Sequence, residues 1–176
     1  GPLQTLAFTP VILPVYEDIN DEFGQTGYVN VAAKLYALLY DTDLDLLFFT
    51  GDSRTTRWGF DFSKNLLTNL EIHGELAWTQ DFPEMTFLED GQVVTHESNV
   101  WSYLLGLRYL TETDLTAIFE YYHNGEGIET DDLKNMFAYI NGAYDTYKRT
   151  GNRSLFGPIN RLTKEGFSWR NPLEDY

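Results

Sequence analysis

Glu71, His73 and Glu75 are the residues of this chain whose types and spacing come closest to a chemical site. Carboxylate oxygens and imidazole nitrogens are common metal ligands. If the segment is a β-strand, side chains two positions apart lie roughly 6.5 to 7 Å from each other on one face. Two of the three can then converge on a cation, and a further ligand must come from a neighbouring strand. We expect paired charges here and no metal site.

Composition excludes several other classes of function. The chain of 176 residues has a formal net charge of −15 and no cysteine. An acidic protein does not present the basic surface that nucleic acid requires, so we expect no nucleic-acid partner. Disulfides and thiolate metal sites are ruled out. The sequence has no Gly-x-Ser-x-Gly, His-Glu-x-x-His or Gly-rich phosphate motif, so we expect neither an enzyme nor a cofactor.

Glu71, His73 and Glu75 lie in one of several segments in which apolar and polar residues alternate. This period of two predicts β-strands with one apolar face. One further candidate strand contains Pro10 and Pro14, which remove backbone donors and either confine it to a sheet edge or make it irregular. The predicted strands span approximately residues 5–16, 28–40, 44–51, 56–64, 69–80, 100–110 and 115–123.

The connections between these strands are alternately short and long. The short ones are turns near 41–43, 65–68 and 111–114, and the long ones are predicted loops over 17–27, 80–99 and 123–176. This asymmetry is typical of a transmembrane β-barrel, with short periplasmic turns and long extracellular loops. No run approaches the roughly 18 apolar residues of a spanning helix, so any membrane interpretation must rest on strands.

We therefore predict an all-β fold, an antiparallel transmembrane β-barrel of up-and-down meander topology, as one domain over residues 1–176. Six or seven strands are too few to close, because the smallest membrane barrels have eight. The residues before Tyr176 do not alternate as a final lipid-facing strand would. The chain is thus expected to be a portion of a larger barrel.

Large aromatic rings fall near the ends of the predicted strands. Following the chain direction from the short turns places one group at the loop end and Phe62 and Tyr109 at the turn end, as in the two aromatic belts of membrane proteins. The alternative is an antiparallel sandwich whose rings fill a core, but a core does not require its largest rings at strand ends. The belt residues are Trp58, Trp78, Trp101, Tyr109 and Tyr121.

The other face of the same strands would line the lumen. Mixed charges there either form cross-strand pairs that stabilise the wall or set the ion selectivity of a pore. Leu38-Leu39 and the segment 46–49 are apolar on both faces, which would suit packing against a plug or an inward-folded loop. The predicted lumen-lining residues are Lys34, Asp45, Arg57, Asp61, Glu71, His73, Glu75, Arg108 and Glu120.

The last long segment contains a predicted amphipathic helix. Thr130 is the expected N-cap and Gly151 the expected stop, with acidic residues in the first turn and basic residues in the last. Gly142 in the middle of the segment lowers the stability of the helix by about 1 kcal/mol relative to alanine, which could split it into two pieces. The apolar stripe is Leu133, Phe137, Ile140, Tyr144 and Tyr147. It must be covered, and we expect it to pack into the barrel mouth against strands 28–40 and 44–51.

Two stretches carry a family resemblance. The run 102–109, followed by 111–122, and the run Trp58-Gly59-Phe60-Asp61-Phe62 resemble the large porin-like outer-membrane barrels of Gram-negative bacteria. The resemblance covers roughly residues 28 to 123. It implies a passive or gated conduit of the bacterial outer membrane, in contact with membrane lipid.

Three interpretations of function follow. The first is a porin-like channel for diffusion or export of ions or small solutes. The second is a barrel that serves as scaffold or sheath for a partner protein, such as a plug in the lumen. The third is a soluble β-sandwich or lipocalin-like binding module.

Overall fold

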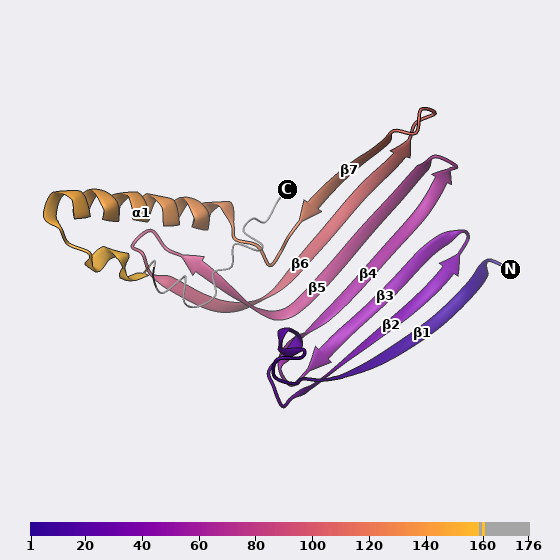
Figure 1. Cartoon of the computed structure of the whole chain (residues 1–176), viewed down its shortest axis with the longest axis horizontal. Helices are drawn as coiled ribbons and strands as arrows, with labels where there is room; N and C mark the ends of the chain where they lie inside the picture. The colour runs from indigo at the N-terminus through magenta and orange to yellow at the C-terminus, as the bar shows by residue number, and fades with distance from the viewer. Residues whose placement is uncertain (159, 161–176) are drawn as a thin grey trace. The chain divides into compact units, whose positions relative to one another are not determined.

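The computed structural model describes residues 1–158 and 160 (Figure 1). The final part of the predicted loop 123–176 lies outside these residues. By its internal contacts the chain divides into two compact units. The first comprises Gly1–Phe82 and Asn99–His123, and the second comprises Pro83–Ser98 and Asn124–Tyr176.

The fold is all-β with one long helix. Seven strands form a single antiparallel meander sheet in which each strand pairs with the next along the chain, as predicted (Figure 1). The sheet is open, with β1 and β7 at its edges. The strands are β1 (Leu3–Pro14), β2 (Val29–Leu39), β3 (Thr42–Gly51), β4 (Arg54–Leu67), β5 (Leu70–Phe87), β6 (Val93–Leu110) and β7 (Thr116–His123).

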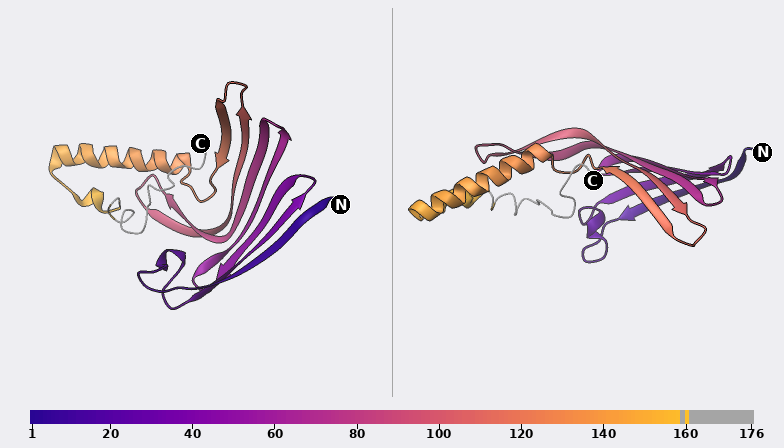
Figure 2. Two further views of the ribbon diagram at one scale, coloured as in Figure 1. Left: turned by 45° about the vertical axis from the view of Figure 1, so that its right-hand side comes forward. Right: turned by 90° about the horizontal axis from the view of Figure 1, so that it is seen from above.

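The register of the strands brings their apolar residues onto one face. Leu35 on β2 lies opposite Leu46 on β3, and Leu46 lies opposite Phe60 on β4. Leu76 continues the row on β5. Because side chains alternate between the faces of a sheet, correct pairing at one row also places the neighbouring rows, up to the irregularities near Leu3, Gly51 and Leu67 at the strand ends. The direction of the strands turns steadily from β1 to β7, the usual twist of such sheets (Figure 2).

The prolines of β1 lie on its unpaired side. The backbone N–H of Val15 donates to the carbonyl of Tyr28, so the odd-numbered residues of β1 direct their backbone groups toward β2. Pro10 and Pro14 therefore occupy positions whose missing N–H would point away from β2. This arrangement explains how two prolines are tolerated in the strand, as the sequence predicted.

The short connections are tight turns. Tyr40 and Asp41 have φ angles of 50° and 55°, and this pair of left-handed residues forms the two-residue turn between β2 and β3. The turn predicted at 65–68 is shorter than expected, because β4 continues to Leu67 and leaves only Thr68 and Asn69 before β5.

The prediction of a long loop over 80–99 is wrong. β5 continues to Phe87 and β6 begins at Val93, so most of the segment is paired strand. The alternation of apolar and polar residues fades there, and polar cross-strand contacts replace apolar ones. The hydroxyl of Ser98 donates to Glu84 at 2.7 Å. The turn comes at Gly91, whose φ of 83° favours glycine.

The helix α1 (Thr130–Thr150) belongs to the second unit. Its N-cap is Glu129, one residue before the predicted Thr130, and it ends as predicted at Gly151, a left-handed residue whose N–H donates to the carbonyl of Tyr147. The helix continues through Gly142. No helix among the described residues is both long and apolar enough to span a membrane.

The predicted stripe of this helix is partly wrong. Leu133 and Ile140 do pack against the buried pair Phe87 and Met136. Phe137 and Tyr144, however, are about half exposed, and the buried positions of the helix are Asp132, Met136 and Ala143. Within the second unit, the apolar partner comes from the far ends of β5 and β6, through Phe87 and Val93. Packing against strands 28–40 and 44–51 of the first unit stays a prediction.

Asp132 is the charged group within this buried face. Burial raises the pKa of its carboxyl, as does repulsion from Glu129, while a hydrogen bond from the backbone of Phe87 opposes the rise. The native state therefore binds a proton here more tightly than the unfolded chain does. The contribution of Asp132 to stability consequently falls as pH rises through its raised pKa.

Replacement of Met136 by alanine tests the packing of the second unit. The side chain of Met136 packs against Phe87 and is only 5% exposed. We expect Met136→Ala to lower the stability of this unit by about 2 to 5 kcal/mol, because contacts are lost and a cavity is left behind. Urea titration followed by helical circular dichroism measures the change. Phe137→Ala is the matched control on the exposed face, and an equal loss there would contradict the assigned packing.

Candidate functional site

The predicted lumen-lining residues all lie on the sheet face opposite the apolar one. Asp45 on β3 is opposite Asp61 on β4, and Asp61 is opposite Glu75 on β5. His73 is opposite Ser63, and Glu120 on β7 is opposite Gly106 on β6. Alternation along each strand then places Lys34, Arg57, Glu71 and Arg108 on the same face.

The first group on this face is a row of three carboxylates with one lysine. Asp45, Asp61 and Glu75 occupy directly opposite positions on three successive strands. Lys34 on β2 forms an ion pair with Asp45 at 2.8 Å. Like charges directly opposite each other are destabilising. Since one lysine serves three carboxylates, this row is a concentrated region of negative charge.

The second group surrounds His73. Its Nε2 lies 3.2 Å from a carboxylate oxygen of Glu120, and its Nδ1 lies 3.6 Å from Glu71, which is too long for a hydrogen bond. The guanidinium of Arg108 donates to Glu71 at 2.8 Å. These contacts join β5, β6 and β7 on the polar face. They fit the prediction of cross-strand charge pairs.

Neither group has the arrangement of a metal centre. Glu71 and His73 are neighbours as the sequence predicted, but Glu75 belongs to the first group with Asp61. Within the described part of the chain, no three His, Asp or Glu residues converge as metal ligands.

Gly106 makes room for the imidazole of His73. A Cβ atom built on Gly106 would lie 2.1 Å from Nε2 of His73. Any larger residue must displace the ring and disturb its contact with Glu120. The glycine is thus required by close side-chain packing across β5 and β6, a role that a single glycine in an alternating segment does not reveal.

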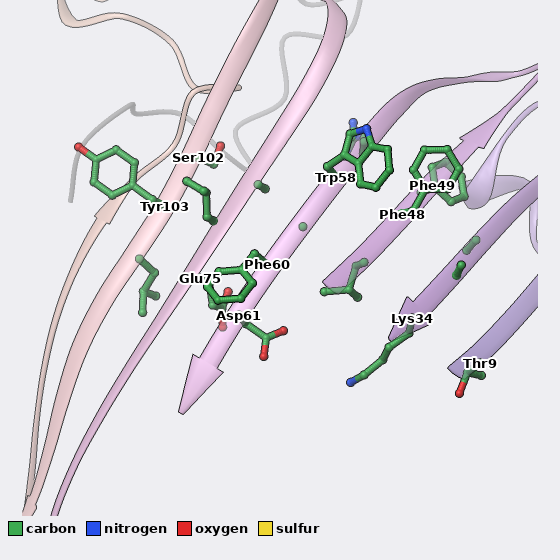
Figure 3. Close-up of a pocket in the computed structure, with 18 of the residues that line it drawn as sticks. Thr9, Lys34, Phe48, Phe49, Trp58, Phe60, Asp61, Glu75, Ser102 and Tyr103 are labelled. Atoms are coloured by element: carbon green, nitrogen blue, oxygen red, sulfur yellow. The ribbon is translucent and has the colours of Figure 1, made fainter. Parts of the chain in front are cut away.

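The polar face also contains a hollow of about 590 Å³ in the first unit (Figure 3). Lys34, Arg57, Asp61 and Glu75 lie in its wall, as does Ser102. Much of the remaining lining is apolar, so this face combines charged residues with an apolar depression. The segment 46–49, apolar on both faces, was the signal in the sequence, and Leu47 and Phe49 do line the hollow.

The opposite face presents a row of aromatic rings across four strands. The centroids of Phe48 and Trp58 are 4.5 Å apart, and those of Trp78 and Trp101 are 6.2 Å apart. Trp58 and Trp78 are directly opposite on β4 and β5, which joins the two pairs. Tyr121 on β7 lies near Tyr103, with centroids 6.1 Å apart. Tyr109 lies eight residues beyond Trp101 on β6, toward the short turns.

Comparison with known proteins adds no family: no family model, curated protein or solved structure matches this chain.

The variant Gly106→Ala tests the second charged group. We expect it to destabilise the first unit by about 1 to 3 kcal/mol, because the added methyl group overlaps the imidazole of His73. The measurement is the midpoint of urea unfolding followed by tryptophan fluorescence. Combining it with His73→Ala should recover most of the loss. If the second change gives no recovery, the ring is not the group that excludes a side chain at this position.

Proposed function

We propose that the chain is a portion of a porin-like outer-membrane barrel that conducts ions or small solutes. On this proposal the apolar face of the sheet contacts lipid, and the face that carries the two charged groups and the hollow lines an aqueous lumen. The proposal includes the bacterial outer membrane as location and lipid as the main partner.

The observation that carries the proposal is the exposure of the apolar face. Phe8 on β1 is 64% exposed, Leu105 on β6 is 57% exposed and Phe119 on β7 is 70% exposed. Contiguous apolar surface of this extent marks contact with membrane or with another protein. A sheet with one apolar face must bury it against something. Lipid provides that contact along all seven strands at once.

The aromatic row favours lipid over the second layer of a sandwich. Rings gathered along one line across β3 to β6 fit the interfacial position of tryptophan and tyrosine. From Trp101 to Tyr109 there are nine residues of β6. Tilted strands need about 9 to 11 residues to span the hydrocarbon core. The distance between the two aromatic levels therefore suits a membrane, whereas a sandwich core imposes no such spacing.

The polar face supports a conduit that prefers cations. The predicted lumen set contains five carboxylates, at 45, 61, 71, 75 and 120, and three basic residues, at 34, 57 and 108. Rings or rows of carboxylates in a pore lower the energy of cations in transit. The apolar lining of the hollow favours a second candidate, a barrel that holds a partner protein in its lumen.

Arginine substitutions at two adjacent leucines test the lipid-facing side. Leu105 lies on the apolar face and Leu104 on the polar face of the same strand. We expect Leu105→Arg to destabilise the assembled barrel by about 2 to 4 kcal/mol and Leu104→Arg to cost much less, since only the first places a charge in lipid. Folding yield and heat-modifiability of the complete protein in liposomes measure the difference. Equal tolerance at the two positions would remove the membrane interpretation.

The lumen-facing carboxylates are tested in planar bilayers. We expect the double variant Glu71→Gln, Glu75→Gln to lower the preference for cations, seen as a smaller reversal potential in a potassium chloride gradient. Glu112→Gln in the turn after β6 is the control and should leave the reversal potential unchanged. If the complete protein assembles but does not conduct, and a second polypeptide co-purifies with it, the scaffold function is the better one.

A further inference from the structure

The hollow on the polar face combines large and small apolar residues. Leu47, Phe49 and Leu104 stand beside Ala32, Gly59 and Ala77. In the sheet, Leu47 lies opposite Gly59, and Gly59 lies opposite Ala77. A Cβ atom built on Gly59 would lie 3.3 Å from Cβ and Cδ1 of Leu47, so the leucine side chain lies against the glycine. Leu47 and Ala77 are thus apolar parts of the lining of the hollow drawn in Figure 3.

The size of the hollow indicates what kind of occupant it suits. Its volume of about 590 Å³ lies within the range of about 300 to 1,000 Å³ that small-molecule sites occupy. Such sites have mainly apolar walls and a few polar groups that fix orientation. A folded partner would instead need complementary contact over a much larger surface. The dimensions therefore favour a small molecule.

The charged residues in the lining of the hollow indicate the sign of the charge that a bound molecule should carry. Asp61 and Glu75 line the hollow, and each lies two residues along its strand from Gly59 or Ala77, on the same face. The neighbouring lysine, Lys34, is already paired with Asp45 at 2.8 Å. Arg57 lies four residues from Asp61 on β4, about 13 Å along an extended strand. The local charge at the Asp61 and Glu75 end is therefore negative.

We propose that this hollow binds a small amphipathic cation, with its apolar body on Leu47, Gly59 and Ala77 and its ammonium group against Asp61 and Glu75. The ammonium group relieves the repulsion between two carboxylates held in direct register, and the apolar body covers surface otherwise exposed to water. This proposal names a solute class for the channel and so rests on the proposed function. Binding itself requires no conduction.

Calorimetric titration of the complete, folded protein in neutral-lipid nanodiscs tests the proposal. The probe is 2-phenylethylammonium, compared with neutral 2-phenylethanol and anionic 3-phenylpropanoate, and empty nanodiscs correct for partition into lipid. We expect saturable binding of the ammonium probe and at least about tenfold weaker binding of the other two, because only the ammonium group forms charge-assisted hydrogen bonds with the carboxylates. Equal or stronger binding of the alcohol or the carboxylate would overturn the proposal.

Two kinds of variant locate the site. The double variant Asp61→Asn, Glu75→Gln should weaken the ammonium probe about tenfold or more while leaving the alcohol unchanged. Ala77→Leu should weaken both probes by filling the hollow without altering charge. Asp43→Asn is the control, since Asp43 is a carboxylate on the same face that does not line the hollow. If Asp43→Asn lowers affinity as much as the double variant, the probe responds to overall charge and the site is wrong.

The two proposals fail in different ways. If the protein binds the ammonium probe as described but gives no conductance, the channel proposal fails and the binding site stands. If conductance is cation-selective but titration shows no saturable binding, the hollow is not a solute site. Co-purification of a polypeptide that blocks the probe would overturn the small-molecule assignment in favour of a bound protein segment.

Discussion

The register of the antiparallel ladder is the constraint on which the rest of the structure depends. A shift of one residue between β2 and β3 would move Leu35 to the polar face and Lys34 to the apolar face. The tight turn at Tyr40 and Asp41 fixes that pairing at one end. Each later strand inherits its orientation from the one before. Both the continuous apolar face and the charged face are products of this single alignment.

The two faces pose different physical problems. The apolar face of the first unit lacks a covering layer among the described residues, and large side chains such as Phe8 and Phe119 remain exposed. The polar face carries ion pairs such as Lys34 with Asp45, yet it also contains an apolar hollow. A sheet of this kind is stable only where the first face meets lipid or protein. The second face combines paired charges with an apolar depression, and this combination is the basis of the solute site that we propose.

The second unit shows that a strand need not end where its apolar alternation fades. β5 and β6 continue to Phe87 and from Val93, and these two residues provide the partner for α1. The helix is covered there through Met136, whose flexible side chain fills the space against Phe87. On the same face, a backbone hydrogen bond from Phe87 stabilises the Asp132 carboxylate and offsets part of the cost of its burial.

The sequence by itself determined the strand periodicity, the meander order, the edge position of a proline-containing β1 and the face on which each charged residue lies. These features are local, because alternation and turn residues act within a few positions. The tertiary structure alone decided that Asp61 joins Glu75 while Glu71 joins His73, since cross-strand partners depend on register. It also decided that Met136 and not Phe137 is buried, because helix orientation depends on which surface the strands offer. The hollow is lined by residues from separate strands, and their proximity follows from cross-strand register, which spacing along one chain does not encode.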